Sequence, residues 1–270
     1  MPDKTVILGA LGSGSSGNAF IIEYNNRALI VDQGFSRREL LKRMESAGVS
    51  PDKLCGALLT HEHSDHCKGS RVFCDELNIP LYTSGKTACY LSRRKMLPRQ
   101  VCSFEPGEEF SIGGINIKSF SLPHDAVDPV GFQFSCGEVK IGIATDFGHA
   151  PENIRRELRG CDALVLESNY DREMLMNSSR TLELKRRIFG VRGHLGNTDS
   201  CQLLPELLSE RTKVLLMAHI SSECNTPELV EKSCSAVLQQ LNMAQQLQFE
   251  ILRQDHPSNF YRIRRETGEN

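Results

Sequence analysis

Short apolar runs recur along the chain and alternate with segments of helical periodicity. Each run has the length of a strand and consists of small or apolar residues, and the runs cover residues 28–31, 57–59, 141–144, 163–166 and 214–218. Continuous apolar runs of this length are typical of strands that are buried on both faces. The pattern therefore predicts an α/β fold.

Two further segments have the pattern of amphipathic helices. Residues 36–47 begin with the capping-box pair Ser36 and Glu39 and end before Gly48. Thr226 and Pro227 open the second segment, whose apolar positions are Leu229, Val230, Cys234, Val237, Leu238 and Leu241. Helices placed between and after buried strands indicate α/β layering.

A polar residue that can bind a metal follows each of the five apolar runs. These residues are Asp32, His61, Asp146, Glu167 and His219, with a threonine before His61 and before Asp146. Ligand sites in α/β sheets form at the carboxyl ends of strands, because rigid strands fix the positions of the groups that follow them. One such residue would mean little, but the series indicates a single shared site.

Length and composition favour one domain. The chain has 270 residues, of which 39% are hydrophobic, and no linker or internal repeat divides it. We therefore expect a single domain over residues 1–270. No apolar run approaches the roughly 18 to 20 residues of a membrane span, and the first residues lack a signal-peptide pattern. Together with ten cysteines that include no C-x-x-C pair, this predicts a cytoplasmic protein without membrane contact.

The charge balance leaves the kind of partner open. A formal net charge of −2 gives no uniform positive field, so a nucleic acid would have to bind through local basic patches. The two candidates are residues 93–95 with Arg99, and residues 185–187 with Arg192. Either run could equally be a solvated face.

The strongest chemical signal is the segment His61-Glu62-His63-Ser64-Asp65-His66. It comes shortly after a buried run and contains three histidines and an aspartate within six residues. On an extended segment His61 and His63 project to the same side, while Asp65 and His66 can address a neighbouring position. Imidazole and carboxylate ligands suit zinc, manganese or iron. The segment therefore predicts a metal site.

His-x-His-x-Asp-His after an apolar strand resembles the central motif of the metallo-β-lactamase superfamily. The other motifs of that superfamily appear in the expected order, at Asp32, His124, Asp146 and His219. Residues 11–18, 167–171 and 193–197 further resemble the YycJ/WalJ-like branch. The resemblance extends over nearly the whole chain.

This resemblance implies a four-layer αβ/βα sandwich with a site for two divalent metal ions. One ion would be held by His61, His63 and His124, the other by Asp65, His66 and His219, with Asp146 as the bridge. The branch implies a metal-dependent hydrolase, a phosphodiesterase or nuclease with DNA exonuclease-like activity, in which Asp65 is one of the catalytic residues. Its partner would be a nucleic acid or another phosphodiester.

Additional roles are expected for residues outside the metal motif. Asp32 would orient a ligand imidazole. His194 resembles a histidine that lies near the scissile phosphate in phosphodiesterase relatives and would protonate the departing oxygen, although a structural or helix-capping role is the alternative. The glycine-rich residues 12–18 either form only a tight turn or also cradle a phosphate, through Ser13, Ser15, Ser16 and Asn18.

Other functions stay open at this level. The superfamily also hydrolyses lactams, lactones, esters and thioesters, and a non-catalytic regulatory protein could retain the fold. Asp146 and His194 favour phosphodiester chemistry. Because no appended substrate-binding domain is evident, residues 84–100 or 172–192 would have to bind the substrate.

Overall fold

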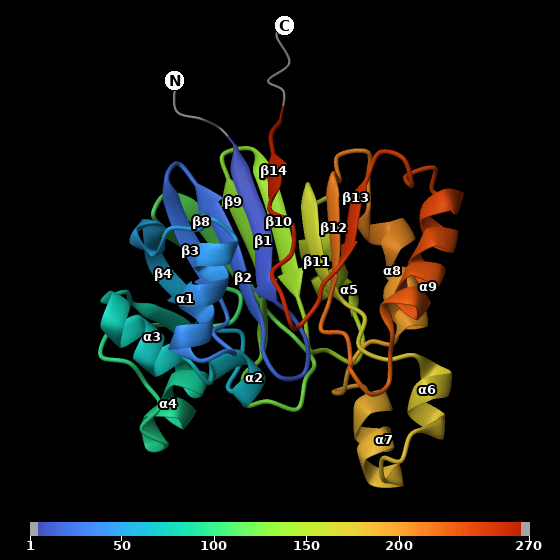
Figure 1. Cartoon of the computed structure of the whole chain (residues 1–270), viewed down its shortest axis with the longest axis horizontal. Coiled ribbons are helices and arrows are strands. Elements are labelled where there is room, and N and C mark those ends of the chain that lie inside the picture. The colour runs from blue at the N-terminus through green and yellow to red at the C-terminus, as the bar shows by residue number, and fades with distance from the viewer. Residues whose placement is uncertain (1–4, 266–270) are drawn as a thin grey trace, which may run out of the picture.

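Two seven-stranded β-sheets pack face to face in the computed structural model, which describes residues 5–265 (Figure 1). The first sheet has the order β14 (Tyr261–Ile263), β1 (Val6–Gly12), β2 (Ala19–Tyr24), β3 (Arg27–Val31), β4 (Leu54–Leu58), β5 (Leu81–Ser84) and β6 (Val101–Phe104). The second has the order β13 (Gln248–Ile251), β12 (Val214–Ala218), β11 (Ala163–Glu167), β10 (Val139–Ala144), β9 (Val130–Cys136), β8 (Ile115–Ser121) and β7 (Glu109–Ile112). Strands β3 to β6 and β10 to β13 are parallel, and the remaining pairs are antiparallel.

Helices cover the outer face of each sheet, which gives the predicted four-layer αβ/βα sandwich (Figure 1). The first sheet carries α1 (Arg37–Ser46), α3 (Ser70–Leu77) and α4 (Gly85–Arg93), and the second carries α5 (Glu152–Leu158), α8 (Asn197–Leu207) and α9 (Pro227–Gln240). A 3-10 turn (Pro51–Lys53) precedes β4. Beyond one end of the sheets lie α2 (Ser64–Cys67), α6 (Arg172–Asn177) and α7 (Leu182–Phe189).

The central strands are apolar on both faces because each sheet is covered on both sides. Along β12, Val214 and Leu216 pack against the other sheet, whereas Leu215 and Met217 pack beneath the helices. Burial of an aliphatic side chain of this size contributes roughly 1.5 to 3 kcal/mol. The apolar runs of the sequence accordingly correspond to β3, β4, β10, β11 and β12.

Two helices begin at the capping residues that the sequence predicts. Thr226 caps α9, and Ser36 caps α1 by accepting a hydrogen bond from the backbone N–H of Glu39 at 3.3 Å. The Glu39 carboxylate pairs with Arg43 at 2.7 Å instead of bonding back to the backbone of Ser36. Of the two hydrogen bonds of the predicted capping box, only the one accepted by Ser36 is therefore present. None of the helices over residues 5–265 is both long enough and apolar enough to cross a membrane. The predicted domain limits, residues 1–270, extend beyond the described residues and stay a prediction.

We expect Arg43→Met to lower the free energy of unfolding by about 2 to 4 kcal/mol. The guanidinium of Arg43 donates hydrogen bonds to the carbonyls of Leu11 (2.8 Å) and Gln254 (2.7 Å) and lies 4.0 Å from the centre of the Phe35 ring. Methionine would fill much of the volume but leave the buried Leu11 carbonyl without this donor. Urea unfolding in metal-free buffer measures the effect.

The matched control is Arg38→Met, an exposed position on the same helix, for which we expect a change of about 0.5 kcal/mol or less. Equal effects of the two substitutions would contradict a structural role of the buried arginine.

Candidate metal centre

The strand-end residues converge at one end of the two sheets. Asp32 follows β3, Asp146 follows β10, and His219 follows β12. Their φ angles are 61°, 64° and 57°, in the left-handed region that non-glycine residues rarely adopt. Each such residue costs about 1 to 3 kcal/mol, and such residues concentrate at functional sites. The chain turns sharply at all three positions. Asp146 Oδ1 then lies 3.3 Å from His219 Nδ1, and Asp32 Oδ2 lies 2.7 Å from Nδ1 of His66.

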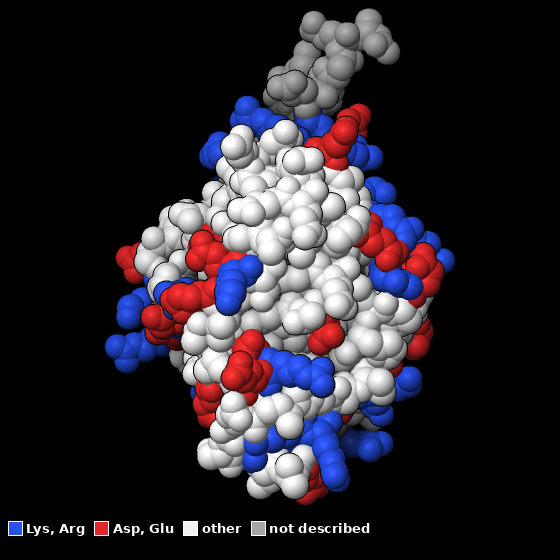
Figure 2. Space-filling view, turned by 90° about the vertical axis from the view of Figure 1, so that its right-hand side faces the viewer, with Lys and Arg blue, Asp and Glu red and all other residues white. Residues whose placement is uncertain are grey.

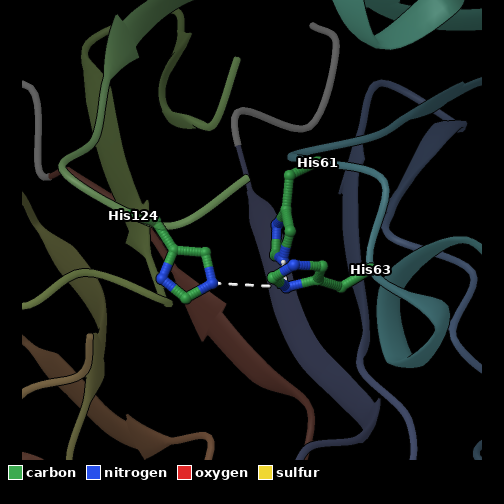
Figure 3. Close-up of side chains that lie close together, drawn as sticks. All are labelled: His61, His63 and His124. Atoms are coloured by element: carbon green, nitrogen blue, oxygen red, sulfur yellow. Dashed lines mark hydrogen bonds between the residues drawn. The ribbon is translucent and has the colours of Figure 1, made fainter. Parts of the chain in front are cut away.

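Three histidines form a first cluster (Figure 3). His61 and His63 come from the loop after β4 on the first sheet, and His124 comes from the loop after β8 on the second. Nδ1 of His63 lies 3.1 Å from Nε2 of His61 and 3.3 Å from Nε2 of His124. One nitrogen from each ring lies within 4.8 Å of the other two. Both sheets therefore contribute to the cluster.

Asp65, His66 and His219 form a second cluster, and Asp146 joins it to the first. Oδ2 of Asp65 lies 3.3 Å from Nε2 of His219 and 3.4 Å from Nε2 of His66. Asp146 Oδ2 lies 3.1 Å from Nε2 of His66. His61, His66 and Asp146 also have donor atoms within 4.8 Å of one another, so the two clusters are contiguous.

Three of these imidazoles are oriented by an acceptor behind the ring. The acceptor lies next to Nδ1, and the pairs are His66 with Asp32 (2.7 Å), His124 with the carbonyl of Gly193 (3.0 Å) and His219 with Glu167 (2.8 Å). These partners assign the ring hydrogen to Nδ1. In a neutral ring, which a metal ligand requires, the lone pair of Nε2 is then directed into the site. His219, whose pKa is raised by the surrounding carboxylates, would release its Nε2 proton when a cation binds.

The donor set fits divalent cations. His63 Nδ1 faces two ring nitrogens, and one ring hydrogen cannot satisfy both contacts well. Asp146 Oδ2 is buried and makes no aligned hydrogen bond among residues 5–265, although Nε2 of His66 lies 3.1 Å away. Imidazole lone pairs and a bare carboxylate oxygen that face a common point are complementary to divalent transition-metal ions.

Buried acids and histidines balance one another's charge at the site. Burial raises the pKa of the Glu167 carboxyl, but His194 and His219 outweigh this effect and hold the pKa at about 2. Burial lowers the pKa of His219, whereas Asp146, Asp65 and Glu167 raise it to about 10. Glu167 is therefore an ionised acceptor at neutral pH.

Glu167 is the residue for which the sequence pattern supplied no role. Its Oε1 lies 2.8 Å from Nδ1 of both His194 and His219, and its Oε2 accepts hydrogen bonds from the backbone N–H groups of Phe147 and Leu195. The available signal was its position at the end of an apolar run. Its two imidazole partners lie 27 and 52 residues further along the chain, too far for any local pattern to reveal.

A cavity of about 190 Å³ opens onto both clusters. His194 is 21% exposed in its wall, and Asp65 is 19% exposed. The remaining lining residues are Ser15, His63, His124, Asp125, Asp146, Asn169, Arg180, Leu184, Arg187, Ile188, Gly193, His219 and Ser221.

The glycine-rich loop contacts the site differently from the expected phosphate cradle. Ser13 and Asn18 are buried, and Ser13 Oγ donates to Asn18 Oδ1 and accepts from the backbone N–H of His219. Nδ2 of Asn18 lies 3.1 Å from Nε2 of His66. These two side chains brace the donor clusters, and their expected role as phosphate contacts stays a prediction. Ser15 lines the cavity, whereas Ser16 is exposed outside its lining.

Known proteins with similar sequences and folds agree with this architecture. Residues 27–220 match the family described as the beta-lactamase superfamily domain. The chain is 32% identical over 245 residues to exodeoxyribonuclease WalJ of Streptococcus pneumoniae, a match that covers 89% of this chain and 91% of WalJ. It is also 32% identical over 243 residues to exodeoxyribonuclease YycJ of Bacillus anthracis, with 89% and 92% covered.

Among solved structures, the metallo-β-lactamase fold protein YhfI from Bacillus subtilis superposes with a TM-score of 0.72. The superposition covers 96% of this chain and all of that one, at 15% sequence identity, so it bears on the fold alone. The fold, the family match and the two full-length relatives lead to the same assignment. The chain belongs to the metallo-β-lactamase superfamily, in the branch that contains WalJ and YycJ.

Proposed function

We propose that this chain is a metal-dependent exonuclease that hydrolyses phosphodiester bonds of DNA. The observation that carries the proposal is the arrangement of two contiguous donor clusters and His194 around one cavity. It is supported by the two relatives that are named exodeoxyribonucleases and match most of the chain.

In this proposal two divalent ions, of zinc, manganese or iron, are the cofactors. One would be held by His61, His63 and His124, the other by Asp65, His66 and His219, with Asp146 shared between them. When bound, such ions lower the pKa of the attacking water and stabilise the charge that develops on the phosphate.

The chain's own residues orient the donors and move protons. Asp32 and Glu167 fix the rings of His66 and His219 from behind. Glu167 also holds Nδ1 of His194, which leaves Nε2 of His194 to protonate the oxygen that departs from phosphorus. Asp65 lies in the cavity wall, where its carboxylate can accept a hydrogen bond from the attacking water.

Cleavage of end-labelled DNA and RNA by the purified protein, in buffers that contain zinc, manganese or iron, tests the proposal. We expect DNA to be shortened from one end, and labels at the 5′ and 3′ ends identify which. Asp65→Ala should lose this activity by about a thousandfold, because it removes a metal donor from the cavity wall.

Three outcomes would contradict the proposal. Equal cleavage by the Asp65→Ala protein would point to a contaminating nuclease. Turnover of nitrocefin or of small lactones and thioesters without any cleavage of DNA would indicate a different hydrolase. Less than one bound ion per chain, without activity in any metal, would indicate a non-catalytic member of the fold.

We also propose a cytoplasmic location. All ten cysteines have free thiols in the structure. Unpaired cysteines are typical of a reducing compartment. Fractionation of cells that express the tagged protein would test the location, and recovery outside the cytoplasmic fraction would contradict it.

A further inference from the structure

One wall of the metal cavity comes from the segment of residues 172–192, here called the α6–α7 arm. The arm projects beyond the end of the second sheet (Figure 1). Four of its residues line the cavity together with the donor residues, namely Arg180, Leu184, Arg187 and Ile188. Arg180 and Arg187 are the only lysine or arginine residues in the lining of this cavity, among residues 5–265.

In each of these two arginines, Nε is paired with an acidic side chain and the terminal nitrogens of the guanidinium are available to a ligand. Arg180 uses Nε to pair with Glu223 at 3.1 Å, and Arg187 uses Nε to pair with Asp125. Within the described part of the chain, neither guanidinium makes a hydrogen bond through its terminal nitrogens. These terminal N–H groups are the ones that form bidentate hydrogen bonds with phosphate oxygens.

The cavity face of α7 combines charge with apolar surface. Arg187 and Ile188 follow Leu184 by three and four residues, so both lie on the same side of the helix as Leu184. Arg186 is exposed and absent from the cavity lining. A guanidinium flanked by aliphatic side chains suits a sugar-phosphate backbone, which alternates charged and less polar groups.

Several other basic side chains of the two candidate patches make contacts within the protein. Arg192 donates hydrogen bonds through Nε and Nη2 to the carbonyl of His124, and so holds the loop of a proposed metal ligand. In the other basic run, residues 93–95 with Arg99, Arg94 stacks on Tyr90 at 3.7 Å and Arg99 bonds to Asp75. Neither of these arginines lines the cavity. Figure 2 shows Lys and Arg side chains, with Asp and Glu among them, at the lower end of the molecule, where α6 and α7 lie.

We propose that Arg180 and Arg187 bind the backbone phosphates next to the scissile one, and that the DNA strand docks on the side of the α6–α7 arm that lines the cavity. This inference rests on the proposed nuclease function. It predicts recognition without sequence preference, because phosphate contacts carry no base information. It also assigns substrate binding to the side of the arm that lines the cavity, which does not include Arg186, instead of to residues 84–100.

Steady-state cleavage of a single-stranded, end-labelled oligodeoxynucleotide tests the proposal with Arg180→Gln and Arg187→Gln. Each variant should raise KM by about tenfold, with a much smaller effect on kcat, and the double variant more. The dependence of log KM on log salt concentration should become shallower by about 0.7 for each arginine lost. With bis(p-nitrophenyl) phosphate, which has a single phosphate, the losses should be several-fold smaller than with DNA.

Arg186→Gln is the matched control, because it removes the same charge from the same helix but away from the cavity. It should leave KM for DNA within about twofold. Arg187→Lys keeps the positive charge but cannot form the bidentate contact of a guanidinium. It should therefore raise KM less than Arg187→Gln does. Metal analysis of each variant excludes an indirect effect through the Arg187–Asp125 pair.

The two levels of the proposal fail in different ways. If the wild-type protein cleaves DNA but the Arg180 and Arg187 variants keep its KM and salt dependence, the docking role is wrong and the nuclease function stands. An equal loss in Arg186→Gln would also overturn the docking role, since general charge would then explain the effect. If the wild-type protein cleaves no DNA, both proposals fail.

Discussion

Replacement of Asp146 by asparagine is expected to reduce DNA cleavage by about a thousandfold or more and to lower the bound metal from two ions to about one per chain. Asp146 is the residue that joins the two donor clusters, and its carboxylate lies 3.1 Å from His66 and 3.3 Å from His219. Asparagine keeps the shape but removes the negative charge that would offset the two proposed cations. The loss should therefore appear in metal affinity as well as in turnover.

Metal analysis after dialysis, together with cleavage rates over a range of metal concentrations, measures both effects. Asp128→Asn is the matched control, because Asp128 lies on the same loop as His124 but pairs with Lys86 and belongs to no donor cluster. It should retain two ions and most of the activity. Full metal content and full activity in Asp146→Asn would show that this carboxylate is not a shared ligand.

The central strands and the metal motif were predictable because their signals are local. A strand buried on both faces must be apolar throughout, and β3, β10, β11 and β12 accordingly appear as continuous runs. His61, His63, Asp65 and His66 lie within one six-residue segment, so their proximity needs no knowledge of the fold. The outer strands have weaker signals, as in β6, where Cys102 and Ser103 are exposed.

The connections between distant segments were not predictable from local patterns. The left-handed backbone of Asp32, Asp146 and His219 depends on what surrounds each strand end, and no residue type in the sequence demands it. The burial of Ser13 and Asn18 follows from the position of β12 beside the glycine-rich loop, which is a property of the tertiary fold. Arg180 and Arg187 line the cavity because of how the α6–α7 arm packs, which is also a property of the tertiary fold.

His194→Ala is expected to retain both metal ions but to lower kcat for DNA by about a hundredfold or more, which is the range of a lost general acid. His194 belongs to the cavity wall, but its only close acidic partner at hydrogen-bond distance, among residues 5–265, is Glu167 at 2.8 Å. Its Nε2 is free to donate a proton, and its removal leaves the other imidazoles and their orienting partners in place.

The leaving group distinguishes a proton donor from a merely structural histidine. p-Nitrophenolate departs readily without protonation, whereas a sugar alkoxide does not, so His194→Ala should impair cleavage of DNA far more than hydrolysis of bis(p-nitrophenyl) phosphate. Equal losses on both substrates would indicate a structural role. His149→Ala is the matched control, since His149 is exposed, bonds to the carbonyl of Val191 and lies outside the cavity lining.

Glu167→Gln separates proton donation from ring positioning. Because Oε1 of Glu167 lies 2.8 Å from both His194 and His219, the amide should weaken the general acid and a metal ligand together. We therefore expect metal affinity to fall by about tenfold to a hundredfold in Glu167→Gln, the usual effect of losing a partner behind a ligand, whereas His194→Ala should leave metal affinity unchanged. If both variants retained metal equally well, the bond from Glu167 to His219 would have no part in metal binding. If both lost metal equally, His194 would act as a ligand instead of a proton donor.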